Sequence, residues 1–240
     1  LIQSIVMTAA LVIILVYGTN VAGGWDTVVA NAKEIPGYLS FTASTNIFAS
    51  EAGKYTPFMI ASTLAWGLGY FGMPHILIHF MAVEDENKLK ISRRVGTVWV
   101  VISLSVAVVI GIIGYSMAKA GALAMPGTEA EAENMIVNSA ALLSTHGVVP
   151  AIVAGIIIAG ILAATMSTAD SQLLAAASGV THNILTDVFG IKLSDKKTMT
   201  IARVTVIGVA ILGVIFASDP NSSIFRVVSF AWAGFGATFG

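Results

Sequence analysis

The sequence predicts an all-α, polytopic membrane protein. Hydrophobic residues make up 56% of the 240 residues and charged residues only 10%, whereas a soluble domain carries about 25% charged residues. The apolar residues form continuous runs and not the alternating pattern of a membrane β-barrel. The net charge of −1 leaves no basic excess for binding phosphates. An ordinary soluble enzyme, a disordered chain and a nucleic-acid binder are therefore excluded.

Six segments are apolar over about the 20 residues that a membrane helix needs. They cover residues 1–18, 57–80, 96–118, 148–180, 199–217 and 224–240. The first and last segments are cut by the ends of the sequence, and Leu1 already lies inside an apolar run. We therefore expect one transmembrane domain over 1–240 that is truncated at both ends.

Basic residues in the connections predict the orientation, because cytoplasmic loops carry an excess of Lys and Arg. Residues 81–95 hold four of them and residues 181–198 hold three, whereas residues 119–147 hold only Lys119. The loops 81–95 and 181–198 are thus expected in the cytoplasm, as in a multi-pass protein of the plasma (inner) membrane. In the outer connections we expect short interfacial helices within 36–56 and 121–147.

The segment 57–80 contains signals that interrupt a helix. Gly67, Gly69, Gly72 and Pro74 fall within eight residues at its middle, where Gly costs roughly 1 kcal/mol and Pro about 3 kcal/mol. An interrupted helix at membrane depth is typical of a transporter binding site. Its aromatic residues favour a small-molecule pocket, with the Tyr70 hydroxyl as a polar group. The alternative is a kinked structural helix in which the aromatic rings fill the kink.

A second pattern lies in the segment 148–180. Ala164, Ser167, Thr168 and Ser171, here called the hydroxyl face, are spaced so that they share one side of a helix. Hydroxyl and carbonyl oxygens are hard ligands, and neutral oxygens suit a monovalent cation such as Na⁺. The alternative is that the hydroxyls bond to carbonyls one turn earlier or to a neighbouring helix.

Asp170 is the only acidic residue well inside one of these segments. A carboxylate at membrane depth is a functional hypothesis by default. An ion-binding or gating role is one interpretation of Asp170 and of the neighbouring Ser171. The alternatives are placement in a water-filled inner vestibule and a hydrogen bond to Gln172 or to another helix.

Three longer motifs give the chain a resemblance to a known family. Residues 66–75 read WGLGYFGMPH, residues 161–174 read ILAATMSTADSQLL, and residues 230–240 read FAWAGFGATFG. In this order and spacing they resemble the sodium:solute symporter family, and the resemblance runs through essentially the whole chain. It implies two inverted repeats of five helices, with the first segment ending repeat one and the other five forming repeat two.

The resemblance also implies roles for individual residues. Sodium would contact the Ala164 carbonyl and the hydroxyls of Ser167 and Thr168. The solute would contact a second set: Trp66, Tyr70, Phe71 and Pro74. Gln3 matches a family residue in the first segment.

The sequence departs from this pattern at Met73, where proline symporters of the family commonly have Gln. Met73 lies inside the expected pocket, so this departure affects the expected identity of the solute more than the expected sodium coupling. Proline, a related amino acid or another small organic solute all stay open.

The function implied is sodium-coupled symport of a small organic solute, with proline or a related amino acid as the expectation. The expected partners are Na⁺, the solute and the lipid bilayer, with no cofactor beyond Na⁺. No nucleophile–base set and no phosphate-binding loop is visible, so we expect no enzyme activity. The alternatives are a symporter-like sensor module of a signalling protein and a structural membrane subunit.

Overall fold

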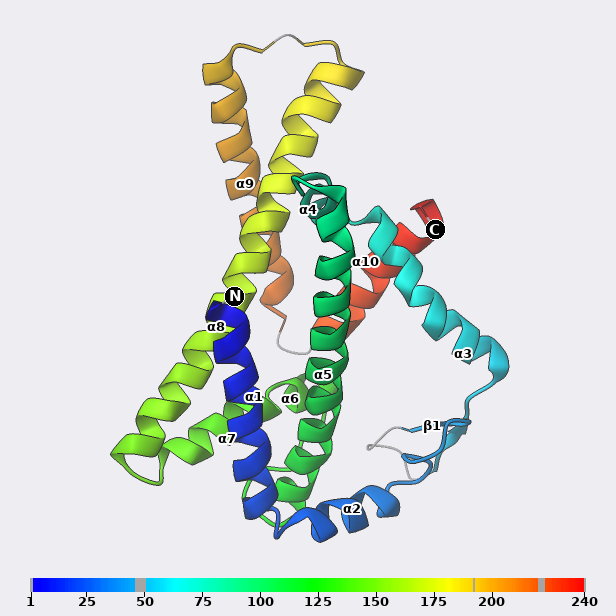
Figure 1. The fold of residues 1–240 in the computed structure, drawn as a ribbon, viewed down its shortest axis with the longest axis vertical. Helices are drawn as coiled ribbons and strands as arrows, with labels where there is room; N and C mark the ends of the chain where they lie inside the picture. The colour runs from blue at the N-terminus through cyan, green and yellow to red at the C-terminus, as the bar shows by residue number, and fades with distance from the viewer. Residues whose placement is uncertain (1, 46–50, 192, 220–222, 240) are drawn as a thin grey trace. The chain divides into compact units, whose positions relative to one another are not determined.

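The computed structural model describes residues 2–45, 51–191, 193–219 and 223–239, and most of them are helical (Figure 1). The chain divides into two compact units. The first comprises Leu1–Trp66 and Glu84–Ala163, and the second comprises Gly67–Val83 and Ala164–Gly240. One long helix, α8, continues from the first unit into the second.

Four helices in the described residues are long and apolar enough to cross a membrane: Gln3–Val21, Glu86–Lys119, Val148–Val188 and Asp195–Ala217. Two shorter apolar helices are Met135–Ser144 and Ile224–Thr238. This confirms the predicted all-α, polytopic architecture. The expected segment 57–80 is not one continuous helix but is divided among α3, η1 and α4.

The first unit is built around α1 (Ile2–Val21) and α5 (Glu86–Lys119), which pack along each other. Gly18 of α1 allows the close approach, because a β-carbon there would lie 2.6 Å from Cγ2 of Ile113. Ile14 and Ile113 are almost completely buried. The helix α7 (Met135–Ser144) and the first half of α8 (Val148–Ser178) add Ala140 and Ile157 to the apolar cluster that contains Ile14.

The connections of the first unit are partly helical. The helix α2 (Trp25–Glu34) follows two glycines, and the ion pair between Glu34 and Lys119 joins its end to the end of α5. The short helix α6 (Glu129–Glu133) precedes α7, so the helices expected within 121–147 are confirmed. The expectation for 36–56 is wrong in its described residues. They form the antiparallel pair β1 (Ala43–Ser44) and β2 (Gly53–Lys54), and the helix α3 (Pro57–Leu64) begins only after Thr56.

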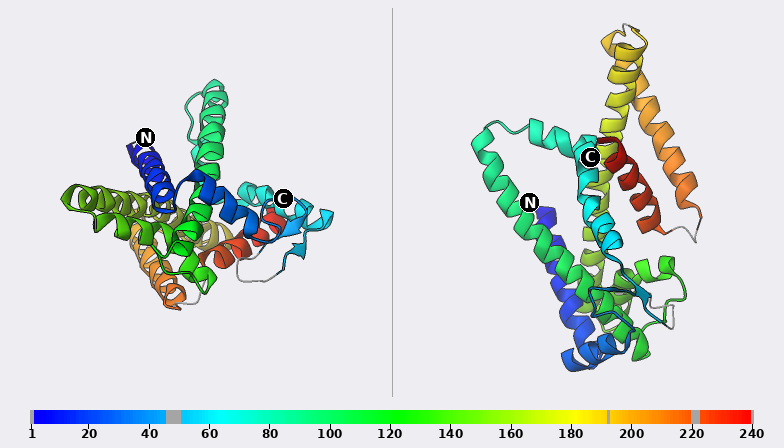
Figure 2. Two further views of the ribbon diagram at one scale, coloured as in Figure 1. Left: turned by 90° about the horizontal axis from the view of Figure 1, so that it is seen from below. Right: turned by 90° about the vertical axis from the view of Figure 1, so that its right-hand side faces the viewer.

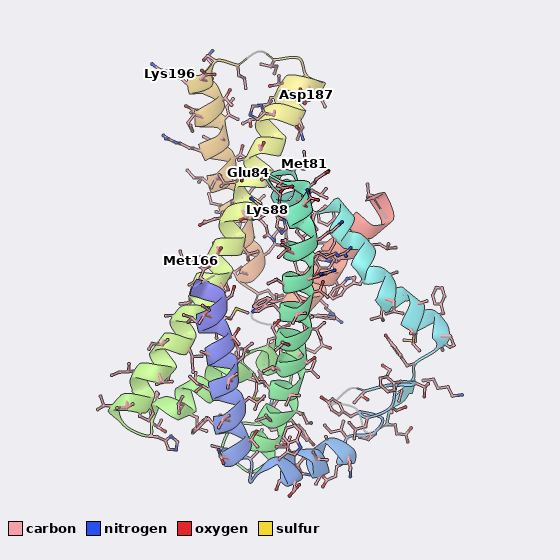
Figure 3. All side chains as sticks on the ribbon, in the orientation of Figure 1. Met81, Glu84, Lys88, Met166, Asp187 and Lys196 are labelled. Atoms are coloured by element: carbon pink, nitrogen blue, oxygen red, sulfur yellow. The ribbon has the colours of Figure 1, made fainter. Side chains whose placement is uncertain are left out.

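The helix α5 begins ten residues before the expected segment. Asp85 is its N-cap, and the Asp85 carboxylate accepts a hydrogen bond from the backbone N–H of Asn87 at 2.9 Å. This cap, with Glu86 in the first turn, lets the helix start before the apolar run does. Most of the residues 81–95 expected as a loop are therefore helical, and the Lys88–Glu84 ion pair lies at their start (Figure 3).

The second unit contains η1 (Ala65–Gly72) from Gly67 onward, α4 (Pro74–Met81), the second half of α8, η2 (Gly179–Val188), α9 (Asp195–Ala217) and α10 (Ile224–Phe239) (Figure 2). The π-helix η2 prolongs α8 beyond the expected end at 180. The Thr186 hydroxyl donates to the Thr181 carbonyl, five residues earlier, at 3.0 Å. This bond fits the wider turn. The expected loop 181–198 therefore shortens to the residues between η2 and α9, with Asp187 and Lys196 close to its ends (Figure 3).

Two glycines of α5 give a matched test of the packing in the first unit. A β-carbon on Gly114 would lie 2.2 Å from Cγ of Met135, whereas Gly111 has nothing within 4 Å. Because overpacking costs about 1–3 kcal/mol, Gly114→Ala is expected to lower the thermal stability of the full-length protein in detergent. Gly111→Ala should leave it unchanged or slightly higher. Equal stability of the two variants would contradict the α5–α7 contact.

Candidate functional site

The chain changes its helical form three times between residues 57 and 81. The α-helix α3 is capped by Thr56, whose hydroxyl accepts from the Met59 N–H. It passes into the tighter 3₁₀ helix η1, and Met73 then adopts an extended conformation with φ −88° and ψ 104°. Pro74 begins α4 as its first residue, where a missing N–H costs nothing. The residues 65–73 are called the break below.

The backbone groups of Met73 are satisfied locally. The Met73 N–H donates to the Tyr70 carbonyl at 3.3 Å, and the Met73 carbonyl accepts from the N–H groups of Ile76 and Leu77, both at 3.1 Å. Such bonds are needed because an unpaired backbone group in hydrocarbon costs several kcal/mol. The break is thus a bonded conformation and not a frayed helix end.

The helix α10 packs directly on the break through Trp232. The rings of Tyr70 and Trp232 meet edge to face, with centroids 5.5 Å apart. A β-carbon on Gly69 would lie 2.7 Å from Cδ1 of Trp232 and 2.9 Å from its carbonyl oxygen. Gly69 therefore has a packing role, because any larger residue would collide with backbone as well as with a ring.

The hydroxyl face lies on α8, with Ser167 and Thr168 exposed and Ala164 half-buried. The Thr168 hydroxyl donates to the Ala164 carbonyl at 3.3 Å, and the Ser171 hydroxyl donates to the Ser167 carbonyl at 3.1 Å. These are the one-turn hydrogen bonds weighed above as the alternative to ion binding. The same geometry places two hard oxygens, the Ala164 carbonyl and the Thr168 hydroxyl, close enough for one cation to contact both.

A cavity of about 510 Å³ lies in the second unit, beside the break. Three elements form its walls: the start of α4, the second half of α8 with the first residue of η2, and α10. Its lining residues are Met73, Pro74, His75, Gln172, Ala175, Ala176, Gly179, Val227, Val228, Ala231, Trp232 and Phe235. Met73 is only 4% exposed, and it is the one residue of the break that lines the cavity among the described side chains.

The structure brings only part of the predicted site together. Of the residues expected to contact solute, Pro74 lines the cavity and Tyr70 contacts Trp232. Trp66 is 37% exposed, and the side chain of Phe71 lies outside the described part of the structure. Asp170 is exposed on α8 and does not line the cavity. In the described residues no three His, Asp or Glu side chains form a metal-binding group.

The sequence suggested Gln172 only as a hydrogen-bond partner of Asp170, and it gave no role to Trp232 or Phe235. All three line the cavity. A signal for Gln172 was present in the spacing. Thr168, Gln172, Ala175 and Gly179 have offsets 0, 4, 7 and 11, so they share one stripe of a helix. Trp232 and Phe235 carried no comparable signal, because their contribution depends on the contact of α10 with the distant helix η1.

These features define a class: a multi-pass helical membrane protein with an interrupted helix, a face of hard oxygens and a small cavity. The family model of the sodium:solute symporter family matches residues 1–240, and the chain belongs to this family. It is accordingly an integral protein of the plasma membrane. No solved structure matches the chain.

Characterised relatives match along the chain. The chain is 35% identical over 240 residues to the osmoregulated proline transporter OpuE of Bacillus subtilis. This match covers all of the chain and 45% of the relative. It is 32% identical over 240 residues to the high-affinity proline transporter PutP of Bacillus subtilis, covering 100% of the chain and 47% of the relative. The sodium/proline symporter of Escherichia coli is 35% identical over 181 residues, 75% of this chain and 35% of the relative. The chain thus spans less than half the length of these relatives.

The packing of α10 on the break can be tested with two glycines of η1. Gly69 meets Trp232, whereas Gly67 has nothing within 4 Å. Gly69→Ala is expected to lower the free energy of unfolding by about 1–3 kcal/mol, measured by thermal unfolding of the full-length protein in detergent. Gly67→Ala should change it by less than about 0.5 kcal/mol. A harmless Gly69→Ala would show that α10 does not pack there.

Proposed function

We propose that the chain serves sodium-coupled secondary active symport of a small organic solute, with proline or a related amino acid as the substrate. The observation that carries the proposal is the interrupted helix 57–81, whose extended residue Met73 lies in the wall of a small cavity. Interrupted helices are the best structural pointer to the binding site of a secondary transporter. Membership of the sodium:solute symporter family and the names of the relatives support the same function.

In this proposal Na⁺ binds at the hydroxyl face of α8. The Ala164 carbonyl and the hydroxyls of Ser167 and Thr168 are its ligands, and the 3.3 Å spacing between two of these oxygens suits a shared cation. Ion binding requires the Thr168 hydroxyl proton to turn away from the Ala164 carbonyl. Neutral ligands hold a monovalent ion without trapping it. Inward movement of one charge releases about 2.3 kcal/mol per 100 mV of membrane potential, which drives accumulation of the solute.

The solute binds at the break, with Trp66, Tyr70, Phe71 and Pro74 as the proposed contacts. Gly67, Gly69 and Gly72 give the break its tight backbone, and alternating access follows from movement of one helix bundle against the other. We propose an ion-linked or gating role for Asp170 and Ser171.

The proposal also includes the fold and its orientation. The parent fold consists of inverted repeats, and the connections 81–95 and 181–198 lie in the cytoplasm. The proposed process needs no covalent chemistry and no cofactor beyond Na⁺. The family and the relatives are named for transport, and neither supports the sensor alternative.

The direct test of this function is uptake of radiolabelled L-proline by the full-length protein in proteoliposomes. An inward Na⁺ gradient should drive accumulation above the external concentration, and an equal K⁺ gradient should not. Uptake that ignores Na⁺ would contradict the coupling. Absence of uptake in folded protein would exclude proline, and a screen of related amino acids for Na⁺-dependent binding would then test the solute class.

The sodium ligands can be tested separately. Ser167→Ala and Thr168→Ala should each raise the Na⁺ concentration for half-maximal uptake about tenfold or more, because each removes an oxygen bonded to a charge. Ser178→Ala, on the same helix and three turns away, is the control and should keep the wild-type Na⁺ dependence. Wild-type Na⁺ dependence in both test variants would exclude this site.

For variants of the solute contacts we expect the opposite pattern, in which the affinity for solute falls more than the affinity for Na⁺. Trp66→Ala and Tyr70→Ala should raise the KM for solute by about tenfold while the half-saturating Na⁺ concentration changes less. The measurement is initial uptake rate against each ligand with the other held at saturation. Equal weakening for both ligands would indicate a structural defect and not a solute site.

A further inference from the structure

The cavity beside the break has a wall that the proposed solute contacts do not account for. Of those contacts whose side chains the structure describes, only Pro74 lines it. Its other walls come from residues about 100 and 155 positions later in the chain, on α8 and α10. All of its lining residues belong to the second unit, so the cavity is a property of that unit alone.

The wall is apolar with a few polar groups. Alanine, valine, methionine and phenylalanine side chains supply most of the lining, and only Gln172, His75 and Trp232 carry side-chain nitrogen or oxygen. Among the described residues, no Asp, Glu, Lys or Arg lines the cavity. Because an unpaired charge in such surroundings is very costly, a ligand with a net charge is disfavoured.

A zwitterion meets these conditions when its two charged ends find partners. The Gln172 carboxamide carries both a donor and an acceptor, so it can bond to a carboxylate and to an ammonium group. Met73 and Trp232 supply flat or adaptable apolar surface for the rest of the ligand. The volume of about 510 Å³ lies within the range of small-molecule sites.

The geometry points to a solute-binding site in this cavity, in which Gln172 binds the charged ends of a zwitterionic amino acid and Met73 limits the size of its apolar part. This inference rests on the proposed symport and specifies where and how the solute is recognised. Gln172 follows Thr168 by one turn on the same stripe of α8. The solute site and the proposed sodium ligand Thr168 therefore share one helix surface.

The test of Gln172 measures uptake of L-proline by the full-length protein at saturating Na⁺. Gln172→Leu should raise the KM for proline at least tenfold and leave the half-saturating Na⁺ concentration within twofold of wild type. Gln172→Asn keeps the carboxamide on a shorter side chain and should restore part of the affinity. Leu174→Ala is the matched control, since Leu174 lies two residues further on α8 and lines a different cavity.

Met73 is tested with imino acids of increasing ring size. Met73→Ala enlarges the cavity, so the KM for the six-membered homologue pipecolate should fall at least fivefold relative to that for proline. A change of both KM values by the same factor would show that Met73 has only a structural role. That result would overturn the assignment of Met73.

The failure of this inference is distinguishable from failure of the proposed function. Wild-type protein that accumulates proline with Na⁺, together with a Gln172→Leu variant of unchanged KM, overturns the cavity site and leaves symport standing. Wild-type protein without any Na⁺-dependent uptake or binding of an amino acid overturns both. Loss of Na⁺ and proline affinity together in Gln172→Leu, without rescue by Gln172→Asn, also overturns the inference.

Discussion

A backbone that leaves the helical conformation inside a membrane must still bond every N–H and C=O group, and this constraint governs the region around Met73. Pro74 has no N–H to bond, and the carbonyl of Met73 accepts from two following N–H groups. The backbone groups of Met73 are therefore paired within the chain itself. The Met73 side chain is buried in the wall of the cavity.

The helix α10 packs against the break and contacts two of its residues. Gly69 lets the Trp232 backbone come close enough that a β-carbon would collide with it, and the Trp232 ring meets Tyr70 edge to face. Trp232 also lines the cavity. One side chain thus connects the packing of the break to the shape of the site, so movement of α10 would alter both together.

The stripe of α8 from Thr168 to Gly179 connects the two proposed ligands. In the proposal, Thr168 offers an oxygen to sodium, and Gln172, one turn later, offers a carboxamide to the solute. Neutral polar groups would serve both a small, hard cation and a zwitterionic solute. A rotation or shift of α8 would change both sites at once, which is the geometric requirement for coupled transport.

The sequence predicted what depends on local pattern. Run length predicted six apolar segments, and four of them are helices long enough to span a membrane in the described residues. The cluster of Gly and Pro predicted an interruption near Pro74, and periodicity placed Ser167 and Thr168 on one face. It missed what depends on distant contacts. Trp232 reaches the cavity only because α10 packs against residues more than 150 positions earlier in the chain.

Boundaries were also missed where polar residues continue a helix beyond its apolar part. The Asp85 cap begins α5 within an expected loop, and the π-helix η2, which contains the Thr186–Thr181 hydrogen bond, follows α8 past residue 180. The pairing of Ala43 with Lys54 is a contact across a connection, which no local period reveals.

The central claim is that the cavity beside the break receives solute in a sodium-dependent manner, and site-directed alkylation tests it most directly. The chain contains no cysteine, so Ala176→Cys places a single reactive thiol in this chain on the cavity wall, in full-length protein cleared of other cysteines. Proline should slow the reaction of this thiol with a membrane-permeant maleimide when Na⁺ is present and not when K⁺ replaces it. Leu174→Cys should react at the same rate in all conditions. Two results would contradict the account. In the first, proline slows the maleimide reaction of Ala176→Cys equally with Na⁺ and with K⁺. In the second, proline does not slow the reaction although the protein transports proline.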